Sequence, residues 1–77
     1  MIDDAERRKM LRVELCGSRV VERLEAIGVT RLSDLCGEDA EELMERVNLA
    51  AGSPIWRPPI ATCALANLID AAERERA

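Results

Sequence analysis

The sequence predicts an all-α protein, a compact orthogonal bundle of about five short helices. Ala, Leu, Glu and Arg dominate the 77 residues while Phe and Tyr are absent, and this composition favours helix over sheet. Apolar residues make up 48% of the chain and charged residues 34%, which is typical of a folded globular domain. Because a chain of this length builds one small core, residues 1–77 are expected to form a single domain.

The first two expected helices are separated by the stretch Cys16-Gly17-Ser18. The first runs from Asp3 to about Glu14, and Asp3 or Asp4 can cap its N-terminus, where a carboxylate also suits the helix dipole. Ser18 can cap the second helix. Its apolar positions follow helical spacing: Val20, Val21, Leu24 and Ile27.

A glycine marks the end of the second helix. Gly28 stands where helices commonly end in the left-handed conformation, and Val29 can fold back as the hydrophobic partner of this C-cap. We therefore predict a positive φ at Gly28.

The next two helices are predicted from their caps. Thr30 can cap a short helix over residues 31–36. Asp39, with Glu42 three residues later, has the form of a capping box and opens a fourth helix that ends at Gly52.

The last expected helix covers about residues 59–74, after the proline-rich stretch 53–59. It is apolar on nearly all sides, which indicates a central, buried helix. Residues 73–77 are expected to fray into solvent. The predicted core consists of six residues from these helices: Leu24, Leu35, Leu43, Val47, Leu65 and Leu68.

Several classes of function are disfavoured. Histidine is absent, which removes Ser-His-Asp and Cys-His catalysis, and no C-x-x-C pair suggests a metal site. We expect Cys16, Cys36 and Cys63 to be reduced and mostly buried thiols. No catalytic residue, metal ligand or cofactor is predicted, so the protein is not expected to be an enzyme.

Membrane insertion and secretion are also not expected. The longest weakly polar run, residues 58–69, is too short to span a bilayer. No apolar segment of the kind found in secretion signals follows the N-terminal charges. We therefore expect a cytoplasmic protein without a membrane partner.

The net charge of -4 is unevenly distributed. Residues 1–36 carry seven basic and seven acidic side chains, whereas residues 37–77 carry four basic and eight acidic ones. An anion-binding face is therefore expected on the first half. The overall acidic balance argues against strong general binding to nucleic acid, because such binding depends on phosphate neutralisation.

Residues 13–36 resemble the helix-hairpin-helix motif. Gly17 matches its second hairpin glycine, Val21 its alanine, Leu24 its leucine and Gly28-Val29 its terminal Gly-Ile pair. Leucine at position 15 replaces the first hairpin glycine, and glutamate at position 14 replaces the usual proline. The leucine restricts how closely a ligand can approach the backbone, and the glutamate repels anions.

The resemblance extends to about residues 13–72, through residues 37–47 and the late apolar helix. This longer pattern is similar to the small bacterial proteins of the pathogenicity-locus family. It implies a tandem helix-hairpin-helix, SAM-like fold, with a first hairpin motif at about 13–36 and a second, degenerate one at about 39–72.

The motif implies weak, sequence-independent contact with DNA phosphates. Gly17, Ser18 and Arg19 would supply N–H groups and a charge at the start of the second helix, and Arg23 and Arg57 would add further charges. The alternative is that Arg19 and Arg23 pair with Glu22, Glu25 or other carboxylates on a solvated face.

A second functional hypothesis is a protein-interaction module that binds another protein or forms a homodimer. Its candidate residues are Ile55, Trp56 and Arg57, since Trp and Arg are enriched at interface hot spots. The alternative is that Trp56 closes the core over the ends of the last two helices. Salt separates the two functions, because phosphate binding weakens steeply with salt and an apolar interface scarcely does.

Overall fold

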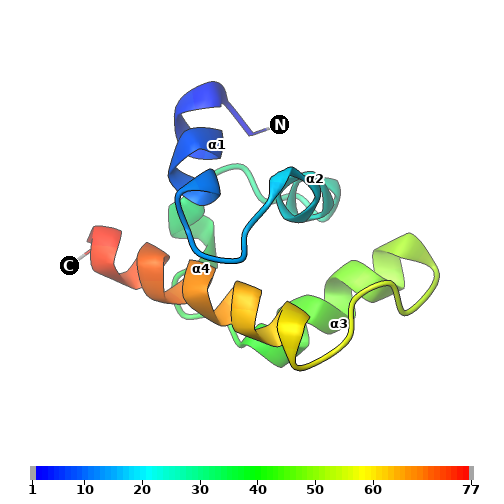
Figure 1. Cartoon of the computed structure of the whole chain (residues 1–77). Helices are drawn as coiled ribbons and strands as arrows, with labels where there is room; N and C mark the ends of the chain where they lie inside the picture. The colour runs from blue at the N-terminus through cyan, green and yellow to red at the C-terminus, as the bar shows by residue number, and fades with distance from the viewer. Residues whose placement is uncertain (1, 77) are drawn as a thin grey trace.

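The computed structural model describes residues 2–76, which form a compact helical domain (Figure 1). Within that range there are four α-helices, one 3-10 turn and no strand, so the all-α prediction is confirmed. The elements follow in this order: α1 (Asp4–Leu11), α2 (Ser18–Ala26), η1 (Leu32–Leu35), α3 (Ala40–Ala51) and α4 (Ile60–Arg76).

The C-terminal helix organises the packing. α4 packs against both η1 and α3, while α1 packs against α2 and η1. In Figure 1, α4 runs along the lower side of the molecule, with α1 and α2 above it and α3 beside it. Among residues 2–76, no helix combines the length and the hydropathy that crossing a bilayer requires.

Three of the predicted helix ends are confirmed. The Asp3 carboxylate accepts a hydrogen bond from the Glu6 N–H at 2.9 Å and caps α1. The Asp39 carboxylate accepts from the N–H groups of Glu41 and Glu42 and caps α3. Gly52 ends α3 in the left-handed conformation, with a φ of 76°.

The end of α2 also follows the prediction. Gly28 has a φ of 96°, and its N–H donates to the Glu25 carbonyl at 3.1 Å. The Val29 N–H donates to the Leu24 carbonyl, also at 3.1 Å, and Val29 is buried. This pair of bonds is the Schellman arrangement, which satisfies carbonyls at the helix end and turns the chain back over the core.

The expected helix over residues 31–36 is instead the single 3-10 turn η1. The Asp34 carboxylate accepts hydrogen bonds from the N–H and hydroxyl of Thr30 and from the N–H of Arg31, each at 3.0 Å. Asp34, rather than Thr30, is therefore the side chain that organises this turn.

Three other helix boundaries differ from the prediction. α1 ends at Leu11 rather than near Glu14. Ser18 is the first residue of α2, and Gly17 is its N-cap. α4 continues to Arg76 instead of fraying from residue 73, and Glu75 in its last turn contacts the Lys9 ammonium at 2.7 Å.

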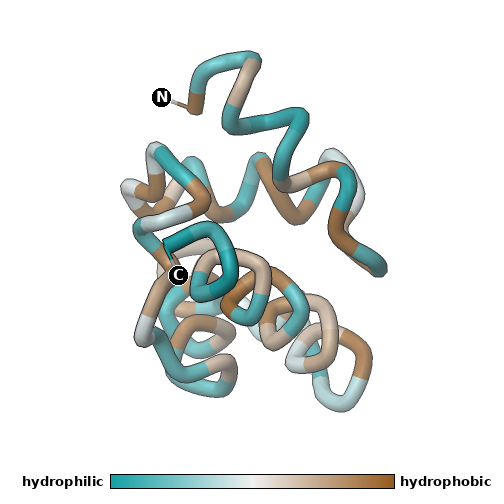
Figure 2. The backbone as a smooth tube through the Cα atoms, turned by 90° about the vertical axis from the view of Figure 1, so that its left-hand side faces the viewer, coloured by the Kyte–Doolittle hydropathy of each residue, from teal (hydrophilic) through white to brown (hydrophobic). Residues whose placement is uncertain are grey.

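The core draws side chains from every helix and from η1. All six predicted core residues are buried in one cluster, which confirms that prediction. α4, however, buries only one face, at helical spacing: Ala64, Leu65, Leu68, Ile69 and Ala72. Ile60, Cys63 and Ala66 are exposed, so the expectation of an all-round buried helix is wrong. Figure 2 shows apolar and polar residues in alternation along the helices.

The three cysteines are free thiols, but they are not equally buried. Cys16 is buried, Cys36 is half-buried and Cys63 is exposed on α4. Burial raises the pKa of the Cys16 thiol to about 11. Cys16 is therefore protonated at neutral pH and acts as a small apolar core residue.

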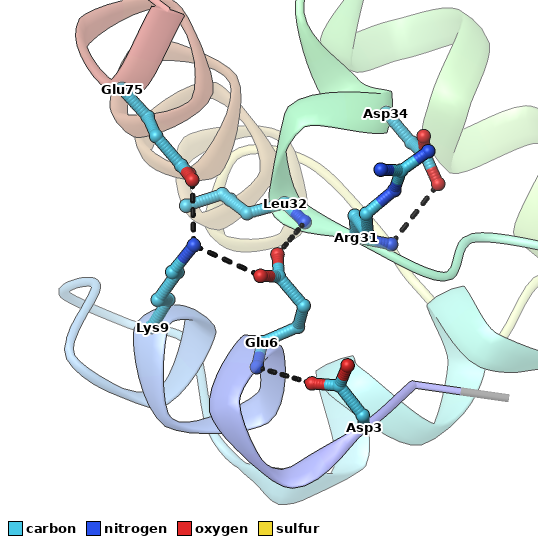
Figure 3. Close-up of polar contacts among 7 residues, drawn as sticks. All are labelled: Asp3, Glu6, Lys9, Arg31, Leu32, Asp34 and Glu75. Carbon is cyan, nitrogen blue, oxygen red and sulfur yellow. Dashed lines mark hydrogen bonds and ion pairs between the residues drawn. The ribbon is translucent and has the colours of Figure 1, made fainter.

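Two side chains of α1, Glu6 and Lys9, connect it to η1 and to α4 (Figure 3). The Glu6 side chain accepts a hydrogen bond from the Leu32 N–H of η1 and another from the Lys9 ammonium, both at 2.9 Å. Lys9 in turn contacts Glu75 of α4 at 2.7 Å. Glu6 and Lys9 thus attach α1 to η1 and α4.

Candidate functional site

The start of α2 is the candidate phosphate contact. Gly17, its N-cap, has a φ of -96° and a ψ of -179°, and its carbonyl accepts from the N–H groups of Val20 and Val21. No side chain of residues 2–76 caps this end of the helix. The first N–H groups of α2 and the positive end of its dipole are therefore available to an anion beside Gly17, Ser18 and Arg19.

Arg19 and Arg23 lie on the surface next to the first hairpin, as predicted. Neither forms an ion pair with any carboxylate of residues 2–76. The alternative pairing with Glu25 is not observed, since that carboxylate accepts a hydrogen bond from the Ile2 N–H at 2.9 Å. Glu22 lines the same surface pocket as both arginines, so its negative charge partly offsets theirs.

Leu15 adopts the left-handed conformation, with a φ of 68°. It is also 57% exposed, so little packing offsets the steric strain that a β-carbon causes in this region. The resemblance described above expects a glycine at position 15. The sequence did not predict that Leu15 would adopt a conformation that glycine favours.

Leu15→Gly is therefore expected to raise the free energy of unfolding by about 0.5–1 kcal/mol. Relief of left-handed strain contributes about 1–2 kcal/mol, and the greater freedom of glycine in the unfolded chain removes about 0.5–1 kcal/mol. Urea denaturation measures the difference. Leu11→Gly is the matched control: Leu11 is helical and also exposed, so that change should destabilise by about 1 kcal/mol. Equal destabilisation by both variants would contradict the assignment of strain to Leu15.

An open apolar pocket of about 230 Å³ lies between the first hairpin, the proline-rich loop and the start of α4. We call it the hairpin pocket. It brings together the two regions that the sequence had suggested as separate sites. Its lining residues are Leu15, Val20, Ile55, Trp56, Arg57, Ile60, Ala61, Ala64 and Leu65.

Asn48, which was not among the residues predicted from the sequence, holds the pocket wall in place. Asn48 of α3 donates a hydrogen bond to the Trp56 carbonyl and accepts one from the Trp56 N–H, both at 3.0 Å. Trp56 itself is half-buried and packs against the core cluster. Both predicted roles of Trp56 are therefore compatible with the structure: it covers part of the core and also lines the pocket.

The pocket is apolar and its single charged lining residue is basic. Ile60 is 72% exposed and Ile55 is 39% exposed, so large apolar surface faces solvent here. Arg57 lines the same pocket as Leu15 and Val20, which places it beside the first hairpin. Among residues 2–76, no carboxylate lines the pocket and no cluster of three metal-ligating side chains occurs.

Comparisons of this chain with protein-family models, with curated proteins and with solved structures found no match.

Proposed function

We propose that this protein is a non-catalytic, cytoplasmic interaction domain that accepts an apolar side chain of a protein partner in the hairpin pocket. The observation that carries the proposal is the pocket itself, where exposed Ile55 and Ile60 flank Trp56 and Arg57. Trp and Arg are the residue types most enriched at interface hot spots.

The small volume of the pocket and the fixed backbone of its wall favour an amino-acid side chain, rather than a small molecule, as the group that it binds. Its volume of about 230 Å³ is below the roughly 300–1,000 Å³ of typical small-molecule sites. The two hydrogen bonds from Asn48 fix the Trp56 backbone before any partner arrives. Such preorganisation reduces the entropy lost on binding.

The fold we infer for this domain is the orthogonal tandem helix-hairpin-helix arrangement of bacterial pathogenicity-locus proteins. Two backbone features support it. Gly28 has the positive φ expected at the end of the motif, and Leu15 has a positive φ where the motif has its first glycine. In this arrangement the hairpin pocket lies where the first hairpin meets the loop of the second.

Peptide selection from a random library tests the proposed function, because the library offers every kind of apolar anchor to the pocket. Displayed peptides that bind the wild type are selected and then counter-selected against Ile60→Glu. The selected peptides should carry a large apolar anchor and bind Ile60→Glu about tenfold or more weakly, as expected for loss of a hot spot. Because Trp56 is the only aromatic residue of the chain, binding should also shift its fluorescence emission to shorter wavelength.

Leu11→Glu is the control for that experiment. It replaces another exposed apolar residue by the same charge, on α1 and outside the pocket, so peptide affinity should equal that of the wild type. Peptides that bind Ile60→Glu as well as they bind the wild type would contradict the proposal.

A second function, weak sequence-independent contact with DNA phosphates, is favoured by a separate observation. The start of α2 has no side-chain cap, and Arg19 and Arg23 beside it form no ion pair within residues 2–76. Arg57 supplies a third positive charge near the same hairpin. The net charge of -4 and the proximity of Glu22 limit this affinity.

Fluorescence anisotropy of a labelled DNA duplex and its single strand tests this second function. We expect micromolar affinity at low salt that falls steeply toward physiological salt, as counterion release requires. Arg19→Glu should abolish the binding, whereas Arg8→Glu, an equal charge change on α1, should weaken it only slightly. Binding that is insensitive to salt, or equally reduced by both variants, would rule out a phosphate contact at the first hairpin.

A further inference from the structure

One apolar side chain outside the core and the pocket is unusually prominent. Leu49 of α3 is 84% exposed, the most exposed large apolar side chain within residues 2–76. It lies near the C-terminal end of α3, which reaches the edge of the molecule at the right of Figure 1. Burying this side chain against another protein would remove apolar surface from water without rearranging the fold.

The surface of α3 next to Leu49 carries two glutamates and one arginine, and that arginine, Arg46, is paired with Glu38 at 2.8 Å. Glu42 and Glu45 precede Leu49 by seven and four residues and are exposed, and this spacing places all three on one face of α3. Because Glu38 offsets the charge of Arg46, the two glutamates leave this face with a net negative charge next to Leu49. Leu49 and the two glutamates are complementary in chemistry to the hairpin pocket, which is apolar and carries Arg57 as its charged lining residue.

We infer that a second copy of this chain occupies the hairpin pocket through Leu49, with Glu45 of that copy facing Arg57. The inference rests on the proposed function, because it names the partner that the pocket binds. Leu49 is not among the residues that line the pocket, so one copy supplies Leu49 to the contact and the other copy supplies the pocket. Electrostatic complementarity fixes which surface meets which.

Sedimentation velocity over a series from micromolar to millimolar protein tests the self-association. The wild type should show a sedimentation coefficient that rises with concentration. Leu49→Glu and Ile60→Glu, each alone, should reduce the association constant by about tenfold or more, as for loss of an interface hot spot. Leu11→Glu should associate like the wild type, and circular dichroism should show all three variants folded.

Mixing the two defective variants is the decisive step. Leu49→Glu keeps an intact pocket and Ile60→Glu keeps an intact Leu49, so the equimolar mixture should associate more strongly than either variant does alone. Failure of the folded variants to pair, or a wild type that stays monomeric throughout the series, overturns the inference.

Binding of the peptides selected on the pocket tests the proposed function independently of self-association. Leu49→Glu should bind those peptides as well as the wild type does, because its pocket is unchanged. A monomeric wild type that still binds the peptides would overturn self-association alone. If the affinity of the peptides were unaffected by Ile60→Glu, the proposed function would be contradicted as well.

Discussion

Leu24→Ala is expected to lower the free energy of unfolding by about 2–5 kcal/mol, the usual range for truncating a buried leucine. Leu24 lies on α2 and is fully buried in the core cluster. A domain of 77 residues has a total stability of about 4–12 kcal/mol at the typical 0.05–0.15 kcal/mol per residue. The loss is therefore a large fraction of the total stability, and a wild type at the low end of that range would not stay folded with this substitution.

Urea denaturation followed by circular dichroism measures this loss. Leu49→Ala is the matched control, because it makes the same change at a residue that is 84% exposed and should alter stability by less than about 0.5 kcal/mol. Similar losses in both variants at low protein concentration would contradict the core described for α2.

Glu6→Ala is expected to lower the free energy of unfolding by about 1–3 kcal/mol. It removes the acceptor of the part-buried Leu32 N–H, and an unsatisfied buried donor carries a desolvation penalty of that size. It also removes one of the two carboxylates that contact Lys9. Glu6→Gln should be milder, because its amide oxygen can still accept from the Leu32 N–H. If Glu6→Ala and Glu6→Gln lowered the free energy of unfolding equally, the charge of Glu6 rather than its hydrogen bond to the Leu32 N–H would be the source of its stabilisation.

The same carboxylate makes stability depend on pH. Hydrogen bonds from Lys9 and from the Leu32 N–H hold the pKa of Glu6 below its ordinary value of 4.5. The stabilisation is therefore fully present above pH 4.5 and is lost as the pH falls through the lower pKa of the folded state. As the pH is lowered through this acid range, the free energy of unfolding should decrease less steeply for Glu6→Gln than for the wild type. Denaturation curves recorded at a series of pH values measure it. If the stability of both proteins depended on pH in the same way, Glu6 would be excluded as a cause of the pH dependence.

Elements with local signals could be predicted from the sequence. Asp3 and Asp39 cap helices because their carboxylates need only the N–H groups of the next three residues. Gly28 and Gly52 end helices in the left-handed conformation, which the glycine itself encodes.

Features that depend on distant contacts could not be predicted. Glu6 meets Leu32, 26 residues away. The hairpin pocket likewise brings Leu15 together with Ile60 of the last helix. The composition of α4 could not show which of its faces is exposed, because Ile60 and Cys63 on the exposed face are as apolar as the residues on the buried face. The left-handed conformation of Leu15 runs against the preference of leucine, so the sequence did not predict it.

The position of α4 in the chain has a consequence for biosynthesis. Leu65, Leu68, Ile69 and Ala72 complete a core whose other members come from residues 2–47. During translation the earlier helices emerge from the ribosome before the residues that bury their apolar faces have been made. The nascent chain therefore cannot close this core until α4 has left the exit tunnel, and until then its apolar surface is open to chaperones and proteases.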